Sequence, residues 1–374
     1  TVKDVELRLQ PSDKFEGRVI NTSGERVADA LIFIGGVPHE SKRQQESVAR
    51  TGPEGTFSLD SLEPDTQIIS AFHPDYAPWG TDITESTEII LPDTAYLAGT
   101  VICEDGDVSG VDIMAFSVEN PYPSSWRTTP QSNGEYKFES LTPGTIHLQV
   151  MNREGRIVMR PILAESAQTT TVDFDLRRGT STVEGRITVE GSTPESGDVQ
   201  LFMTTENGKE TYRATIDSEG FFKAENLPAG HSRMKVGVQS QDKVTMTRFV
   251  EFDLAERESV RKDVDVFGRG SLSGVVLGLE PDYKVRVYAL SHTVSLPEQM
   301  TIPFMWELGR DTCGIAECVE DGTFEIIGLA PGYYTVLAIK APQDDDMDLT
   351  MWRHASHLVT VEGTGTVSVE FDFQ

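Results

Sequence analysis

Residues able to carry out chemistry are few in this chain and are widely spaced. One close pair of histidines, His354 and His357, could meet in a loop, but no third metal ligand lies near them in the sequence. No Gly-x-Ser-x-Gly turn, cysteine–histidine pair or phosphate-binding loop occurs. The sequence therefore predicts no catalytic residue, no bound metal and no cofactor, and it favours a protein that is not an enzyme.

The cysteines and one acidic run offer weaker signals. Cys313 and Cys318 are close enough in sequence to close a small loop through a disulfide bond in an oxidising compartment. Cys103 follows a strand-like segment and is expected to be a small core residue. The run from Asp344 to Asp348 makes calcium a candidate ligand, although it lacks the spaced Asp-x-Asp-x-Asp-Gly pattern of a calcium loop.

The tryptophans are the candidate ligand or partner contacts. All four fall in predicted loops or at loop edges, among proline, serine or charged residues, and they are Trp79, Trp126, Trp306 and Trp352. An aromatic ring at a loop tip can stack on a sugar or anchor a partner protein. The alternative is that each loop folds back and buries its own tryptophan.

The net charge of the chain limits the classes of molecule that it can bind. The chain carries 60 acidic and 32 basic residues, for a formal net charge of -28. Nucleic acid and anionic membranes repel such a chain unless it has a concentrated basic patch, and none is visible in the sequence. No apolar run is long enough to cross a membrane, so we expect no membrane insertion.

A hairpin that occurs four times in the sequence indicates the elements that must position these residues. Each copy has a turn glycine followed seven positions later by a leucine, and the pairs are Gly55 and Leu62, Gly134 and Leu141, Gly220 and Leu227, and Gly322 and Leu329. Each turn glycine is placed where φ must be positive, and the strand after it alternates aromatic and polar residues. A repeat of about 80 to 100 residues indicates an array of domains.

Short alternating strands surround every hairpin, and no longer segment keeps a helical apolar period. This pattern predicts an all-β chain of sandwiches. The linkers are only a few residues long, so we expect an elongated, semi-rigid rod. The longest insertion, Ser291 to Glu317, is the loop most expected to make a specific contact.

The repeats divide the chain into a short leading segment and four units. Residues 1–12 resemble a closing strand, and we interpret them as the remnant of a preceding unit or as a strand donated to a neighbouring molecule. The β-sandwich units are predicted at 13–94, 95–178, 179–269 and 270–374, the last with the long loop insertion.

The hairpin motif Gly-x-Phe/Tyr-x-Leu/Phe, followed by Leu-x-Pro-Gly, resembles the carboxypeptidase regulatory-like family, in four tandem copies. The third copy departs from the motif at Ala229 and the first at Asp65, both at a turn. The resemblance implies transthyretin-like or Ig-like folds, which are seven-stranded Greek-key β-sandwiches. The zinc-binding His-x-x-Glu spacing of the carboxypeptidases that carry such a module is absent from the chain.

The resemblance implies accessory modules of secreted or surface proteins. We therefore expect a non-enzymatic structural or adhesive array that spaces or presents a binding region, in an extracellular, cell-surface or periplasmic location. One alternative is a carbohydrate- or peptide-binding accessory array of a larger protein. Another is a fibre subunit that self-associates by strand donation. The expected partners are protein or carbohydrate at the cell surface.

Overall fold

A computed structural model describes residues 14–37, 43–60, 62, 66, 68–84, 86–104, 106–117, 125–153, 156–291, 293–297, 300–343 and 352–373. Strands make up most of these residues. The helices found among them are the short α1 (Arg43–Glu46) and the longer α2 (Ile302–Asp311). The prediction of an all-β chain is confirmed. The leading segment 1–12 lies outside the described residues.

The first unit is a sandwich of two sheets. A three-stranded sheet has the order β4-β1-β7, and a four-stranded sheet has the order β3-β2-β5-β6. The strands are β1 (Phe15–Asn21), β2 (Leu31–Ile34), β3 (Ala49–Arg50), β4 (Thr56–Leu59), β5 (Ile68–Phe72), β6 (Trp79–Asp82) and β7 (Glu88–Leu91). The chain switches sheets several times, which is the connectivity of a Greek-key sandwich.

The same pairing recurs in the three later units. In the second and third units the closing strand is divided into two short pieces. The second unit comprises β8 (Ala95–Ile102), β9 (Asp112–Ser117), β10 (Ser125–Thr128), β11 (Glu135–Leu141), β12 (Gly144–Met151), β13 (Ile157–Ala164), β14 (Thr169–Thr171) and β15 (Phe174–Asp175). The third comprises β16 (Ser181–Val189), β17 (Ser196–Thr205), β18 (Gly208–Thr215), β19 (Phe221–Leu227), β20 (Gly230–Gln239), β21 (Thr245–Leu254), β22 (Ser259–Arg261) and β23 (Val264–Val266). The fourth comprises β24 (Gly270–Leu277), β25 (Tyr283–Leu290), β26 (Thr312–Glu317), β27 (Thr323–Leu329), β28 (Gly332–Pro342), β29 (Arg353–Val361) and β30 (Thr366–Asp372).

A glycine in the first strand of each unit makes room for the hairpin that defines the repeat. A Cβ atom added at Gly99 would lie 1.7 Å from the Val172 carbonyl oxygen and 3.0 Å from the Tyr136 ring. Gly185 lies equally close to Phe222, and Gly274 to Phe324. The aromatic ring of the hairpin strand therefore packs directly over the glycine, a close approach that only a residue without a Cβ atom permits.

Each unit has its own hydrophobic core. The four clusters of buried side chains draw on residues 19–91, 95–176, 183–266 and 272–371. The proposed unit boundaries at 94, 178 and 269 fall between these clusters and stay predictions.

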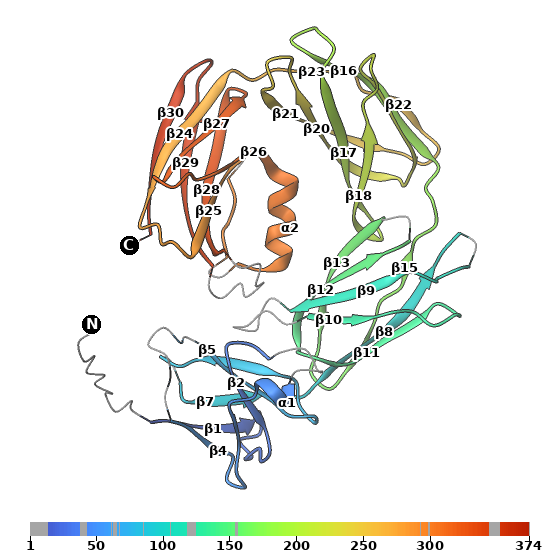
Figure 1. Cartoon of the computed structure of the whole chain (residues 1–374). Coiled ribbons are helices and arrows are strands. Elements are labelled where there is room, and N and C mark those ends of the chain that lie inside the picture. Colours follow the sequence, from blue (N-terminus) through green and yellow to red (C-terminus); the bar gives the residue numbers. More distant parts are fainter. Residues whose placement is uncertain are drawn as a thin grey trace, which may run out of the picture.

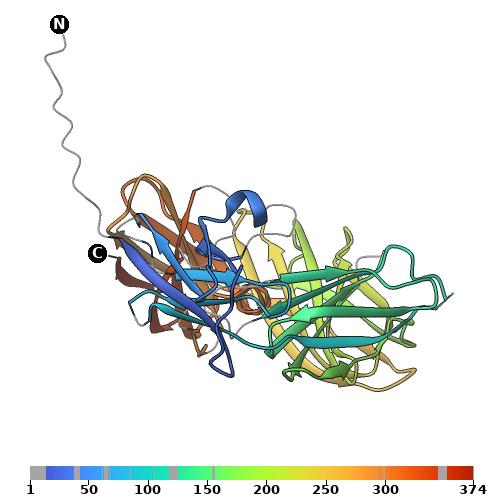
Figure 2. The same ribbon diagram turned by 90° about the horizontal axis from the view of Figure 1, so that it is seen from below.

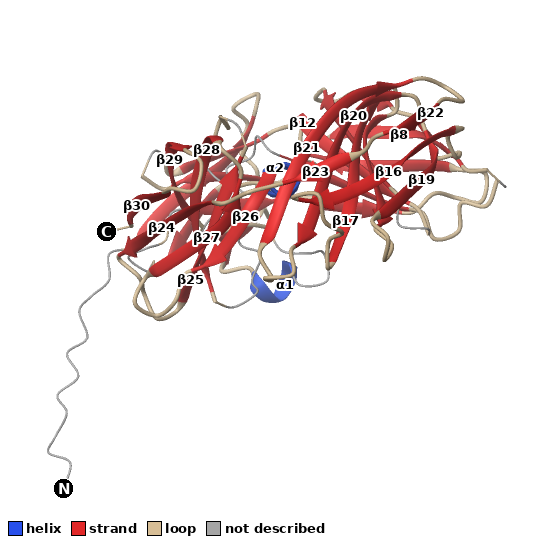
Figure 3. Ribbon diagram, turned by 90° about the horizontal axis from the view of Figure 1, so that it is seen from above, coloured by secondary structure: helices blue, strands red, loops and turns tan. Residues whose placement is uncertain are grey.

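The four units follow a curved path. Figure 1 shows the first unit (blue) and the fourth (orange to red) at the two ends of an arc, with α2 on its inner side. The views from below and from above show that the arc lies close to one plane (Figures 2 and 3). The tandem array that the repeats predicted is present, and its path is curved, where the short linkers had suggested an elongated, semi-rigid rod.

Candidate binding cleft

The second and third units share one sheet. Strand β13 pairs antiparallel with β18, with Ile157 opposite Thr211 and Met159 opposite Lys209. The result is an eight-stranded sheet in the order β10-β9-β12-β13-β18-β17-β20-β21. Within a single unit β13 and β18 would each be an edge strand, and their pairing covers both edges.

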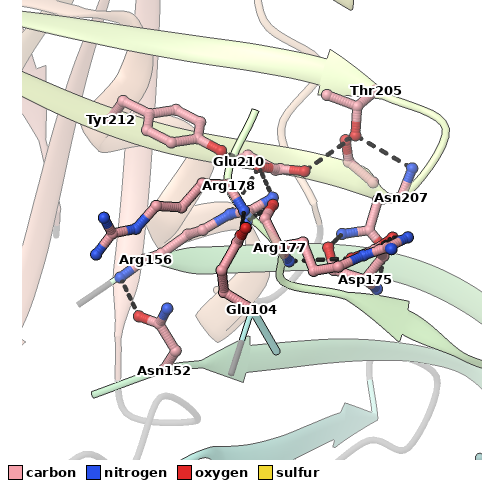
Figure 4. A network of polar contacts seen from close by, with 11 residues as sticks. Glu104, Asn152, Arg156, Asp175, Arg177, Arg178, Thr205, Asn207, Glu210 and Tyr212 are labelled. Carbon is pink, nitrogen blue, oxygen red and sulfur yellow. Dashed lines mark hydrogen bonds and ion pairs between the residues drawn. The ribbon is translucent and has the colours of Figure 1, made fainter. Parts of the chain in front are cut away.

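A buried ion pair fixes this junction (Figure 4). Arg156 Nη2 lies 2.7 Å from Glu210 Oε2, and the two side chains are 11% and 1% exposed. The Tyr212 hydroxyl donates to the same carboxylate oxygen, and Arg156 also donates to the carbonyl of Arg177 at 2.8 Å. Burial raises the pKa of Tyr212 well above its ordinary value, so the phenol stays a donor. Hydrogen bonds and opposite charge together make this buried pair tolerable.

A second set of contacts holds the linker between the same two units (Figure 4). Asn207, at the turn between β17 and β18, accepts from the amide of Asp175 at 3.1 Å and donates to its carbonyl at 2.9 Å. The amide of Arg178 donates to Glu104 at 2.9 Å. Because side chains of both units bind the linker backbone, the junction has little freedom to bend.

Helix α2 lies between the fourth and third units. Thr301 caps its N-terminus by accepting from the Phe304 amide, with a proline in the first turn. One side of the helix covers the outer face of the sheet of the fourth unit, where Leu308 packs in a small cluster with Leu337 and Ile339. On another side, the Arg310 guanidinium stacks 4.8 Å from the ring centroid of Phe202 in the third unit.

Polar contacts also join α2 to the third unit. Lys209 Nζ lies 2.7 Å from Glu307, and Lys235 Nζ donates to the carbonyl of Gly309 at 3.0 Å. Arg233 pairs with Asp311 at the end of the helix. The long insertion therefore makes its specific contact within the chain, where it connects the fourth unit to the third.

The second unit, the third unit and α2 together enclose a cleft of about 1100 Å³. Its floor is formed from β13, β18, β17 and β20, and one wall is formed by α2. The basic side chains that line it are Arg156, Arg178, Lys209, Arg213, Lys235 and Arg310. Glu225 is the acidic residue that lines it, and it is paired with Lys223 at 2.6 Å.

The basic side chains of the cleft are affected chiefly by their burial. Burial lowers the pKa of Lys235; Cys313 and Asp198 act against this shift, and Arg233 and Arg213 add to it. Burial likewise lowers the pKa of Arg310. The basic patch that the sequence did not reveal is thus present. Its residues come from β18, β20, α2 and the segments before β13 and after β15, and the signal was the basic residues on one face of β18 and of β20.

The four candidate tryptophans are not gathered at one place. Trp79 lies in β6 and Trp126 in β10, each half-buried against the core of its own unit. Trp352 precedes β29 and packs beneath α2. Trp306 lies in α2 and lines the cleft. Trp79, Trp126 and Trp352 lie in a loop or at the start of a strand, whereas Trp306 lies in a helix where a loop was expected, and it is the one that the structure brings to the cleft.

The predicted disulfide bond is not formed. Cys313 and Cys318 are both free thiols. Cys313 lies in β26 and Cys318 just beyond its end, and five residues of extended strand separate Cα atoms by about 16 Å, whereas a disulfide requires less than about 7 Å. Burial raises the pKa of Cys318 to about 11.

The histidine pair does not form a metal site among the described residues. His354 and His357 both lie in β29, and an odd spacing sends their side chains to opposite faces of the strand. No group of three potential metal ligands occurs in the ranges that the structure describes. The run from Asp344 to Asp348 lies outside these ranges, so the calcium hypothesis stays untested there.

Comparison with known proteins gives distant likenesses. No protein-family model matches the chain, and no curated protein matches it. The Bacillus anthracis TIE protein is 13% identical, with 98% of this chain and 75% of that one covered at a TM-score of 0.22. A streptococcal ancillary pilin is 11% identical, covering 75% and 99% at 0.21. The minor pilin of Streptococcus agalactiae is 16% identical, covering 51% and 94% at 0.24.

These TM-scores and identities are low, so nothing about function is carried over from these proteins. Among the described helices, none is long and apolar enough to cross a membrane.

Proposed function

We propose that this chain is a non-enzymatic structural or adhesive array of an extracellular or cell-surface protein, in which rigidly joined β-sandwiches hold a binding region in place. One observation carries the proposal. The sheet runs without interruption from the second unit into the third, and the Arg156–Glu210 pair is buried at the crossing. A flexible tether would need none of this, whereas a scaffold that fixes the position of a binding region requires it.

Small-angle X-ray scattering of the full chain tests the rigid-scaffold proposal. A single curved shape should account for the scattering, unchanged between about 50 and 500 mM salt, because the junction contacts are buried and poorly screened. A string of independently moving units would contradict the proposal, since its largest dimension would exceed that of the arc and vary with salt.

A second candidate is a carbohydrate- or peptide-binding accessory array, and the cleft favours it. Trp306 and the basic side chains form a concave, mixed polar and aromatic surface of the kind that ligands occupy. The fibre-subunit alternative depends on residues 1–9, which lie outside the described part of the chain, so it stays untested.

A further inference from the structure

We propose that the cleft between the second unit, the third unit and α2 binds an acidic oligosaccharide, a chain of sugar rings that carry carboxylate or sulfate groups. The inference rests on the proposed function as a binding array and names the class of ligand. It depends on three features of the cleft: basic groups that form no ion pair with a described residue, a floor without a free strand edge, and an aromatic side chain in the wall.

The basic groups stand in register on the floor. Gln200 of β17 lies opposite Arg213 on β18 and opposite Lys235 on β20. Arg213 and Lys235 are therefore two strand spacings apart, about 10 Å. Arg213 is exposed and makes no ion pair with any described residue, and the ammonium of Lys235 is satisfied by a backbone carbonyl alone.

Several of the other basic groups in the cleft are already compensated. Arg156 is paired with Glu210, and Glu307 lies beside both Lys209 and Arg310. Even so, the six basic side chains that line the cleft outnumber the two carboxylates of Glu210 and Glu307. An anion bound between Arg213 and Lys235 would relieve the repulsion between them, and this relief would contribute to affinity.

The rest of the molecule would restrict such a ligand to the cleft. The chain as a whole carries a net charge of -28, so an acidic polymer is repelled by most of the surface. A positive cleft on a negative body therefore favours a short anionic segment over a long one. This argues against nucleic acid, which would extend far beyond the cleft.

The architecture of the floor favours a glycan over an acidic peptide. An extended peptide binds by adding to a free sheet edge, but β13, β18, β17 and β20 each have a neighbour on both sides. The floor and walls instead offer Thr211 and Asn226, whose polar groups both donate and accept hydrogen bonds as sugar hydroxyls do. Trp306 adds a flat ring with a polar edge.

The test is a calorimetric titration of the full chain with four probes of six residues each and with a short thymidine oligonucleotide. A sulfated heparin hexasaccharide and a hexagalacturonate supply the two anionic groups, maltohexaose supplies uncharged sugar, and hexaglutamate supplies charge without sugar. One or both acidic sugars should bind, at least about tenfold more tightly than either control. Maltohexaose lacks the charge-assisted hydrogen bonds, and hexaglutamate lacks the hydroxyl groups that would pair with Thr211 and Asn226. Which of the two binds identifies the anionic group.

Variants connect binding to the cleft. Arg213→Gln and Lys235→Gln should each weaken the acidic sugar by about tenfold, and Trp306→Leu should weaken it while leaving the salt dependence unchanged. Lys243→Gln is the matched control, because it removes an exposed lysine from the turn between β20 and β21, outside the residues that line the cleft, and it should leave binding unchanged. Circular dichroism confirms that each variant is folded.

Three results would overturn the inference. These are no binding of either acidic sugar, tighter binding of hexaglutamate or of a short thymidine oligonucleotide, or binding that Arg213→Gln and Lys235→Gln leave unaltered. Any of these would remove the ligand assignment while a rigid arc in scattering still supported the scaffold. If scattering showed a flexible chain that nevertheless bound the acidic sugar, the scaffold proposal would fail and the ligand assignment would stand.

Discussion

Glu210 is the residue on which the junction of the second and third units most depends. Its carboxylate is almost fully buried and accepts from Arg156, Thr205 and Tyr212. Glu210→Ala leaves the arginine charge buried without a partner, so the free energy of unfolding should fall by about 3–5 kcal/mol. Urea denaturation followed by circular dichroism measures this loss.

Two further variants distinguish the stability lost with the ion pair from the stability lost when any carboxylate is truncated. Glu225→Ala removes an exposed carboxylate of the same unit and should change stability by less than about 0.5 kcal/mol. Arg156→Met combined with Glu210→Leu replaces both charges and should recover most of the loss. If Glu210→Ala costs no more than Glu225→Ala, the pair does not fix the junction.

Asp173 should make the second unit sensitive to acid. Its carboxylate accepts from the hydroxyl of Thr100 at 2.7 Å and from its amide at 2.8 Å, and these bonds lower the pKa of Asp173 below its ordinary value. A carboxyl whose pKa is lower in the folded state stabilises the fold above its unfolded pKa, and this contribution is lost as pH falls through the folded pKa.

The measurement compares wild type with Asp173→Asn between about pH 6 and pH 2. Wild type should be the more stable protein near pH 6, and the difference should shrink on acidification. A difference that stays constant over this range would show that the carboxylate does not titrate as described.

The residue types predicted the local backbone geometry, but they did not predict the cleft. The turn glycines Gly134 and Gly322 were predicted to have positive φ, and they do, at 85° and 82°. The cleft side chains were not found, because Lys209 and Lys235 become neighbours of α2 only through strand pairing and helix docking. The disulfide predicted between Cys313 and Cys318 was wrong for the opposite reason. Residues that are close in sequence lie far apart when the backbone between them is extended.

At the scale of elements, close approach between β27 and β21 joins the fourth unit to the third. Gly328 has φ of 82°, and a Cβ atom there would lie 2.3 Å from the Thr245 carbonyl oxygen. Gly328→Ala should therefore cost about 2 kcal/mol, from backbone strain and from the displaced contact. Thermal unfolding measured by calorimetry checks this.

Gly309 provides the contrasting substitution in α2. It is exposed, and a Cβ atom there meets nothing within 4 Å. Gly309→Ala should stabilise the protein by up to about 1 kcal/mol, because alanine is the better helix former. Equal effects of the two substitutions would mean that the contact between β27 and β21 is absent in solution.

The strands were predictable and α2 was not. Alternating residues and turn glycines specify the hairpins locally, so their positions followed from the sequence. Helix α2 is short, and the apolar residues that pack it, such as Phe304 and Leu308, serve one narrow contact with the sheet beneath. The remaining signal was Thr301 followed by Pro303, a cap and an early proline that mark a helix start.

At the scale of the whole molecule, the repeat predicted the number and type of units but not their path. Short linkers are compatible with either a rod or an arc. The choice depends on contacts between residues far apart in sequence, such as β13 with β18 and Arg310 with Phe202. Nothing in the local pattern of β13 or β18 distinguishes an edge strand from one that continues into the next unit.

Hydrogen exchange across the β13–β18 pair tests the central claim most directly. If the two units share one sheet in solution, the amides of residues 157–159 and 209–211 that face across the pair should exchange as slowly as those of the interior strand β17. If instead they exchange as fast as the amides along the outer side of β29, an edge strand in its sheet, the units are separate and the rigid scaffold is contradicted.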